Sequence, residues 1–218
     1  MPTLYTWNTP NGQKPAILLE ELKVDYDLVP INIMTGVQFE SEFTNINPNS
    51  KIPAYKDDDV VLFESGAIVQ HLADSHESFL ARSGQARASA LSWCYWQVGG
   101  LGPMIGQWAH FAGTADLGEA DGDSSYALNR YLRETVRLYE VLEGRLAESP
   151  YLAGEQYSIA DVMCYPWVIG GLIRLKPAVG ESLPEYTNAE RWVTDIAARP
   201  AVQQAMQRLE NAAKDSTD

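Results

Sequence analysis

The spacing of apolar residues changes once along this chain, near residue 80, and this change limits the possible folds more than any other feature. Before that point, short apolar stretches of strand length alternate with stretches of helical spacing. From about residue 85 onward the spacing is helical throughout, and the stretch from His76 to Gln85, which has no strong periodicity, separates the two patterns. The sequence therefore predicts an α/β domain at residues 1–80 and an all-α domain at residues 87–213.

The first part predicts the element order βαβαββα, which implies a mixed sheet with a parallel pair first and a hairpin last. The expected strands are Thr3–Trp7, Tyr26–Ile33, one that starts at Ile52–Tyr55, and Val60–Phe63, and the expected helical segments are Pro15–Leu22, Phe39–Phe43 and Glu64–Ser75. Pro15 is placed in the first turn of its helix, where proline is tolerated.

Two features of the second part predict local structure. Ser158 and Asp161 have the spacing of a capping box, with Asp in place of the usual Glu, and the apolar run Val162–Ile173 follows. Three glycines and a proline weaken the helix expected around Trp93–Met104. Close packing of this backbone against a neighbour explains the glycines, and a second subunit is one candidate for that neighbour.

Charge and hydropathy exclude several classes of protein. A formal net charge of -13 disfavours nucleic acid and anionic membranes as partners. The acidic residues, including a modest cluster at Glu119, Asp121 and Asp123, fit a solvated surface. No apolar run approaches the roughly 18–20 residues of a membrane helix. The first residues also lack the basic-then-apolar pattern that is typical of a signal peptide. We therefore expect a soluble, cytoplasmic protein.

The chain has only two cysteines, Cys94 and Cys164, and both lie in apolar helical stretches. They lack the C-x-x-C spacing of a redox pair, and two cysteines alone do not indicate a metal site. We expect both to be small buried hydrophobic residues. Because no cysteine precedes residue 94, any thiol chemistry in the first domain must use a sulfur that a bound molecule brings.

Polar groups that can bind a peptide cluster around the expected strand ends. If the Ile52–Pro53 bond is cis, the backbone of Ile52 can pair with a ligand as an added strand. The Ser65 hydroxyl and the first amides of the following helix can hold a carboxylate, and Glu64 can accept from an ammonium. The alternative for Glu64 and Ser65 is a plain helix cap. Lys51 is a possible counter-ion, although single lysines are usually solvated, and Gln38 is a possible polar contact.

Thr9 and Asn11 stand at the entry of the first helix, where free amides and the positive end of the helix dipole face outward. A free thiol has a pKa of about 8.5, so it is mostly protonated at neutral pH. Donors at this position would stabilise the thiolate of a bound ligand. The alternative for Thr9 is a turn that leads into a helix cap.

The chain resembles the cytosolic glutathione transferases over nearly its whole length, and in detail their nu class of bacterial glutathione-dependent disulfide-bond oxidoreductases. The strings that carry the resemblance are Thr9-Pro-Asn-Gly, Asn47-Pro-Asn, Lys51-Ile-Pro-Ala, Phe63-Glu-Ser-Gly-Ala-Ile, Trp96-Gln-Val-Gly-Gly-Leu-Gly-Pro-Met, Arg130-Tyr and Tyr157-Ser-Ile-Ala-Asp. The first and fifth of these are the most specific. The resemblance implies a thioredoxin-like domain followed by an all-helical domain, assembled as a homodimer.

The resemblance also implies roles for single residues. The residues that it assigns to glutathione binding are Asn11, Gln38, Lys51, Ile52, Glu64 and Ser65, joined by Arg130 from the helical domain of the other subunit. It implies that Thr9 and Asn11 donate to the glutathione sulfur, and that Tyr5 belongs to the core. The chain departs from the pattern at Gln13 and at the string Gln107-Trp108-Ala109-His110-Phe111. There, Trp108 is expected to narrow or reshape the pocket for the second substrate. His110 is a candidate to assist the reaction, although a lone histidine near aromatic residues is more often structural.

The leading hypothesis is a glutathione-dependent disulfide-bond reductase that uses bound glutathione thiolates, with no protein cysteine, no metal and no permanently bound cofactor. The small substrate would be a disulfide. A second hypothesis is conjugation of glutathione to small electrophiles, since both reactions use the same thiolate. A third is a non-catalytic, glutathione-binding regulatory protein, because a yeast relative in the family is regulatory.

Overall fold

The computed structural model describes residues 1–117, 124–180 and 183–215. They form two compact units, one of Met1–Arg87 together with the segment from Asp195 onward, and one of Ala88–Thr194. The predicted boundaries at residues 80 and 87 stay a prediction. The acidic residues Glu119, Asp121 and Asp123 lie outside the described residues.

A four-stranded mixed sheet forms the centre of the first unit. Its strands are β1 (Thr3–Thr6), β2 (Asp27–Pro30), β3 (Ala54–Lys56) and β4 (Val61–Phe63). Their spatial order is β2-β1-β3-β4, in which β1 pairs parallel with β2 and antiparallel with β3. Strands β3 and β4 form the antiparallel hairpin. The predicted order βαβαββα and the mixed sheet are confirmed.

Helices connect and cover these strands. They are α1 (Pro10–Leu22), the 3₁₀ turn η1 (Val37–Phe39), α2 (Ser41–Thr44) and α3 (Ser65–Ser75). Helix α1 begins five residues earlier than predicted, because Pro10 takes the favourable first-turn position and the Thr9 side chain caps the helix. Pro15 therefore lies inside the helix, where it cannot donate to the Asn11 carbonyl.

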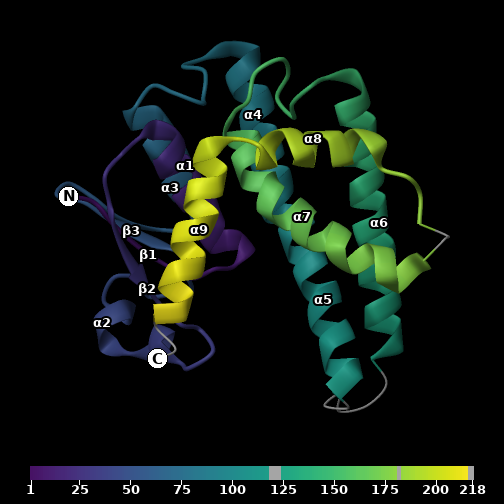
Figure 1. Cartoon of the computed structure of the whole chain (residues 1–218), viewed down its shortest axis with the longest axis horizontal. Helices are drawn as coiled ribbons and strands as arrows, with labels where there is room; N and C mark the ends of the chain where they lie inside the picture. Colours follow the sequence, from purple (N-terminus) through teal and green to yellow (C-terminus); the bar gives the residue numbers. More distant parts are fainter. Residues whose placement is uncertain (118–123, 181–182, 216–218) are drawn as a thin grey trace. The chain divides into compact units, whose positions relative to one another are not determined.

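The last helix, α9 (Pro200–Asp215), packs against α1 and β2 within the first unit (Figure 1). Two ion pairs fix it to α1. Arg199 contacts Glu21 at 2.5 Å, and Arg208 contacts Glu20 at 2.8 Å while its guanidinium lies 4.1 Å from the ring centre of Tyr26. Both glutamate side chains are less than a tenth exposed, so α9 covers one face of α1.

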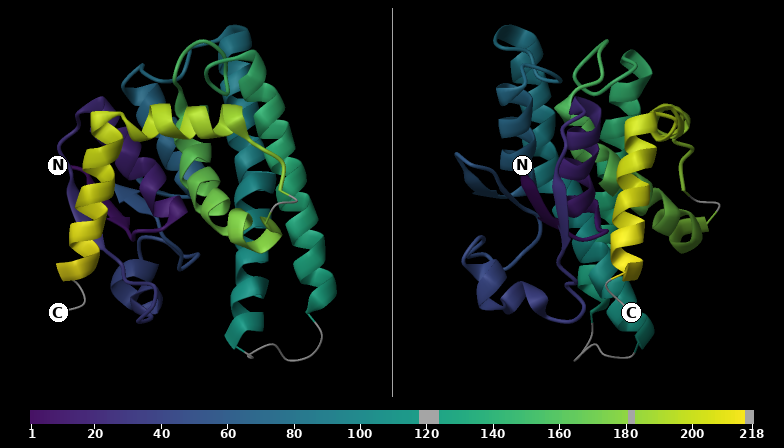
Figure 2. Two further views of the ribbon diagram at one scale, coloured as in Figure 1. Left: turned by 45° about the vertical axis from the view of Figure 1, so that its right-hand side comes forward. Right: turned by 60° about the vertical axis from the view of Figure 1, so that its left-hand side comes forward.

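In the described part of the second unit, the regular elements are all helices, apart from one isolated β-bridge. Its elements are α4 (Gly84–Trp96), the π-helical segment η2 (Gln97–Leu101), α5 (Gly102–Leu117), α6 (Ser125–Glu148), α7 (Ile159–Val179) and α8 (Thr187–Ala197), the first and last of which cross the unit boundary. Helices α5 and α6 run side by side (Figure 2). The fold is thus the predicted thioredoxin-like domain with an all-helical domain.

Two local predictions for the helical unit can be compared with the structure. The capping box of Ser158 and Asp161 is confirmed, and Asp161 is fully buried. The glycine-rich stretch packs partly on its own chain. A Cβ at Gly102 would lie 2.4 Å from Gln97 Nε2 and 3.2 Å from the indole of Trp167, so the close packing at this glycine comes from its own chain. In the described residues, no helix is long and apolar enough to cross a membrane.

Candidate functional site

The N-terminus of α1 is built on a close approach of two backbone segments. The Thr6 hydroxyl donates to the Gly12 carbonyl at 3.1 Å, and a Cβ on Gly12 would lie 2.1 Å from the Trp7 carbonyl oxygen. Only glycine fits there. The Thr9 hydroxyl accepts from the Gly12 amide at 3.4 Å. Thr9 is therefore a helix cap, and the hydroxyl hydrogen is still available as a donor, so its two predicted roles are compatible.

Lys14 links this helix start to the start of α3. Its side chain is 1% exposed, and its ammonium donates to Asn11 Oδ1 at 2.9 Å and to Ser65 Oγ at 3.3 Å. Because helical side chains lean toward the N-terminus, Lys14 reaches back over the first turn of α1. Asn11 and Ser65, which the sequence predicts to be in one site, thus contact the same nitrogen atom.

The start of α3 differs from a plain helix cap. Glu64 occupies the N-cap position with φ 72°, a conformation that non-glycine residues rarely adopt, and its side chain makes no capping hydrogen bond. The Glu64 side chain is exposed, whereas Ser65 is 6% exposed. The carboxylate of Glu64 is therefore accessible to a ligand, and such strained residues cluster at functional sites.

The loop before β3 is organised by Asn47, whose side chain is 1% exposed. Its amide nitrogen donates to the Lys51 carbonyl at 2.5 Å, and its carbonyl oxygen accepts from the Asn49 amide at 2.9 Å. The Ile52–Pro53 bond is cis, as the strand-pairing hypothesis required. Ile52 packs partly buried against the core cluster of the sheet, and the Lys51 side chain is exposed.

Gln38 lies on η1 with its amide nitrogen donating to the Ile33 carbonyl at 3.2 Å. This bond turns the amide oxygen the other way. That oxygen is buried and has no hydrogen-bond partner among the described residues. Buried acceptors are nearly always paired, so this oxygen is an exception within the described part of the chain.

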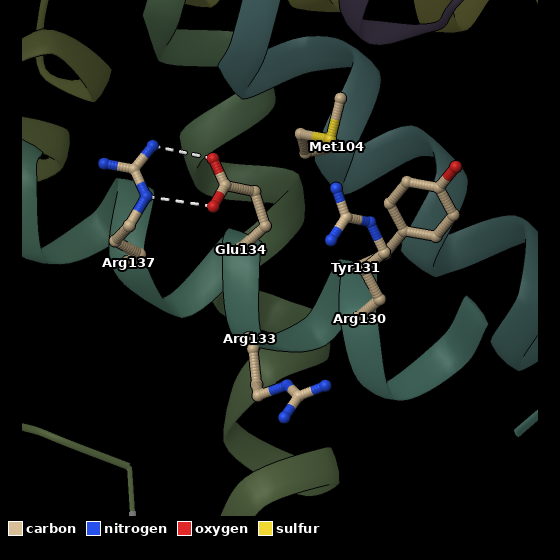
Figure 3. Close-up of a pocket in the computed structure, with 6 residues that line it drawn as sticks. All are labelled: Met104, Arg130, Tyr131, Arg133, Glu134 and Arg137. Atoms are coloured by element: carbon tan, nitrogen blue, oxygen red, sulfur yellow. Dashed lines mark hydrogen bonds and ion pairs between the residues drawn. The ribbon is translucent and has the colours of Figure 1, made fainter. Parts of the chain in front are cut away.

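Arg130 belongs to the helical unit, where α6 and Met104 of α5 form a pocket of about 560 Å³ (Figure 3). Its lining residues are Met104, Arg130, Tyr131, Arg133, Glu134 and Arg137. Arg137 binds both carboxylate oxygens of Glu134, at 2.6 and 2.9 Å, and this hydrogen bonding holds the pKa of Glu134 below its ordinary value. Arg130 is exposed at this pocket. Three arginines give the surface a positive charge within an acidic chain.

Three further predictions concern aromatic residues. Tyr5 packs partly buried against the sheet core, with its ring centre 6.4 Å from that of Phe43, in agreement with a core role. Trp108 is 3% exposed, so its ring is part of the packed interior, and its effect on a second-substrate pocket stays a prediction. His110 is exposed and meets the ring of Phe111 edge-on at 5.5 Å.

Both cysteines are free thiols and buried, Cys94 at 8% and Cys164 at 0% exposure, as predicted. Lys14 and Asn47 were not identified from the sequence as individual contributors to the candidate site. The i, i+3 spacing of Asn11 and Lys14 is the signal that could have identified the first. Asn47 lies four residues before Lys51, in a proline-containing loop of the kind that asparagine side chains often close.

Comparisons with known proteins cover both units. Residues 2–74 match the family model described as glutathione S-transferase, N-terminal domain, and residues 104–200 match glutathione S-transferase, C-terminal domain. Among curated proteins, the disulfide-bond oxidoreductase YfcG of Escherichia coli (strain K12) is 44% identical over 213 residues, which cover 94% of each chain.

Two solved structures are similar over nearly the whole chain. A glutathione transferase from Pseudomonas putida, with one glutathione disulfide bound per subunit, has a TM-score of 0.85 and 34% identity, covering 94% of this chain and 90% of that one. A glutathione transferase family member from Pseudomonas fluorescens pf-5, with two glutathione bound, has a TM-score of 0.84 and 34% identity, covering 94% and 92%. The relatives therefore match the fold and both halves of the sequence.

Proposed function

The chain belongs to the glutathione S-transferase family, and from this premise we propose that it is a glutathione-dependent disulfide-bond reductase. The observation that carries the proposal is the location of its own thiols. Cys94 and Cys164 are both buried in the helical unit, and no cysteine occurs among the residues around the start of α1. The attacking sulfur must therefore come from glutathione. The 44% identity to a disulfide-bond oxidoreductase supports the same reaction.

Two glutathione molecules supply the electrons. The thiolate of the first attacks one sulfur of the substrate disulfide, which forms a mixed disulfide and releases the other substrate sulfur as a thiolate. The thiolate of the second attacks the glutathione sulfur of the mixed species, so that glutathione disulfide forms and the second substrate thiolate leaves. Both released thiolates take up the protons that the two glutathione thiols lost. One disulfide is thus reduced and two glutathione molecules are oxidised.

The residues at the helix starts fit this chemistry. Thr9 and Asn11 would donate to the glutathione sulfur, and each unit by which they lower its pKa takes 1.36 kcal/mol of preferential binding of the anion. Ser65 and the first amides of α3 would bind one carboxylate, with Glu64 on the ammonium, Ile52 on the peptide backbone, and Gln38 and Lys51 as further contacts. We further propose a cytoplasmic homodimer in which Arg130 of one subunit reaches a glutathione carboxylate in the other.

The test removes both protein thiols. Cys94→Ala together with Cys164→Ala should keep kcat/KM for reduction of hydroxyethyl disulfide by glutathione within about twofold, while two lost sulfur atoms in the core cost about 1 kcal/mol each in stability. Loss of turnover in a variant that remains folded, judged by circular dichroism, would overturn the mechanism. Calorimetry with reduced glutathione and its disulfide tests the binding on which the mechanism depends.

Conjugation of glutathione to small electrophiles is the second candidate, because the matching family models and both solved relatives are described as transferases. The two activities are ranked by comparing turnover on hydroxyethyl disulfide with turnover on 1-chloro-2,4-dinitrobenzene. A non-catalytic binding protein is distinguished by Asn11→Ala. In a catalyst this change lowers the rate far more than the stability, whereas a binding protein shows no turnover to lose.

A further inference from the structure

The ammonium of Lys14 is the most deeply buried charge at the candidate site, and the proposed reaction does not yet use it. The side chain is 1% exposed, although lysine is seldom fully buried. The contacts of the ammonium include two neutral oxygens, Asn11 Oδ1 and Ser65 Oγ. Removing an ammonium from water is costly, so hydrogen bonds such as these are needed to hold a buried lysine in place.

An ammonium has three donors and no acceptor, and this fixes the roles of both of its partners. Asn11 must present its carbonyl oxygen to Lys14, which turns the amide N–H₂ group to the opposite side. Ser65 must accept from Lys14 through a lone pair, so that its hydroxyl hydrogen points elsewhere. Asn11 and Ser65 are thereby both set as hydrogen-bond donors toward whatever binds beside them.

The position of Lys14 relative to the two helices points to an anionic ligand. Residues 11 and 65 lie in the first turns of α1 and α3, which are 13 and 11 residues long, and the positive ends of both helix dipoles are here. Two neighbouring helix starts favour an anionic group beside them, such as a thiolate or a carboxylate.

We propose that Lys14 is a positioning residue for glutathione: it orients the Asn11 amide as a donor to the sulfur and the Ser65 hydroxyl as a donor to a carboxylate. The inference rests on the proposed function, since it assigns a role in binding and ionising the same ligand. Lys14 itself need not touch glutathione.

A double-mutant cycle tests the inference with reduced glutathione and hydroxyethyl disulfide as the probes. Lys14→Met keeps the apolar stem and removes the charge, and Lys56→Met, which removes an exposed lysine on β3, is the matched control. Lys14→Met should lower kcat/KM about 10- to 100-fold, as expected for loss of hydrogen bonds from a charged group. It should also raise the pKa of the bound glutathione thiol by about one unit, measured from the ultraviolet absorbance of the thiolate. Lys56→Met should change neither quantity.

The cycle separates positioning from simple structural damage. If Lys14 acts through Asn11, the factor by which Lys14→Met lowers kcat/KM should be at least about threefold smaller in an Asn11→Ala background than in the wild type. Equal losses in both backgrounds, or an unchanged pKa of the bound thiol, would overturn the inference. If Lys14→Met does not fold, Lys14→Leu, which also lacks both the charge and the hydrogen-bond donors, takes its place with the same expectations.

Failure of this inference differs visibly from failure of the proposed function. A wild-type protein that neither binds glutathione in calorimetry nor reduces hydroxyethyl disulfide contradicts the proposed function itself. A wild-type protein that does both, together with a Lys14→Met variant that behaves like Lys56→Met, contradicts only the role of Lys14.

Discussion

Asp161 offers a stability test whose size follows from its contacts. One oxygen of its buried carboxylate accepts from the Leu152 amide at 3.0 Å and from the Trp192 indole at 2.9 Å. The other accepts from the Ser158 amide at 2.9 Å and from the Ser158 hydroxyl at 3.2 Å. Asp161→Asn can keep the first oxygen, but it sets an N–H₂ group against the Ser158 amide. Asp161→Ala leaves three buried N–H donors without this acceptor.

Because of these contacts, the two substitutions should lower the free energy of unfolding by different amounts. A buried donor left unsatisfied costs about 1–3 kcal/mol, so we expect about 2 kcal/mol for Asp161→Asn and about 5 kcal/mol for Asp161→Ala. In a chain of this length 1 kcal/mol changes the melting temperature by about 3 °C, which gives decreases of about 6 °C and about 15 °C.

Thermal unfolding at one fixed protein concentration measures both changes, with the exposed Asp25→Asn as the matched control. The control should melt within about 1.5 °C of the wild type, since surface substitutions rarely change stability by more than about 0.5 kcal/mol. The reasoning is refuted if Asp161→Asn also melts within that range, because donor opposed to donor in a buried site cannot be neutral.

Three further outcomes follow from the structure. Gly12→Ala should cost about 3 kcal/mol, because its Cβ would lie 2.1 Å from the Trp7 carbonyl oxygen; an unchanged melting temperature contradicts this. Arg130→Ala should raise the KM for glutathione about tenfold with little change in kcat, and equal KM values in steady-state assays would remove Arg130 from the site. The hydrogen bond from Arg87 at 2.7 Å holds the pKa of Asp74 below its ordinary value. Its stabilisation is therefore present above about pH 4 and is lost as the pH falls through the lower folded-state pKa, so the difference in melting temperature between wild type and Asp74→Asn should shrink in acid.

The order of elements could be predicted because strand-length and helix-length apolar patterns differ in the first 80 residues. The capping box at Ser158 could be predicted for a similar reason, since both of its partners lie within one helical turn. The start of α1 was predicted at Pro15 because both Pro10 and Pro15 suit the first turn of a helix. The helix begins at Pro10, which is the proline that follows the capping residue Thr9.

The candidate site was less accessible to sequence reasoning. Lys14 and Ser65 are 51 residues apart and meet only through the packing of α1 on α3. A lysine is usually solvated, so its burial could not be anticipated from its type. The positive φ of Glu64 is equally hidden, since glutamate rarely adopts it. In both cases the environment overrides the ordinary preference of the residue.

The attachment of α9 to α1 determines when the first unit can be completed during synthesis. Arg199 and its partner Glu21 are separated by 178 residues. At about 5–20 residues per second, a ribosome needs roughly 10–35 seconds to make that stretch. During this time the carboxylates of Glu20 and Glu21 remain in water, and the face of α1 that α9 will cover stays open. The first unit of a nascent chain therefore begins to form before the second unit is made, and it is completed only after the second unit has been made.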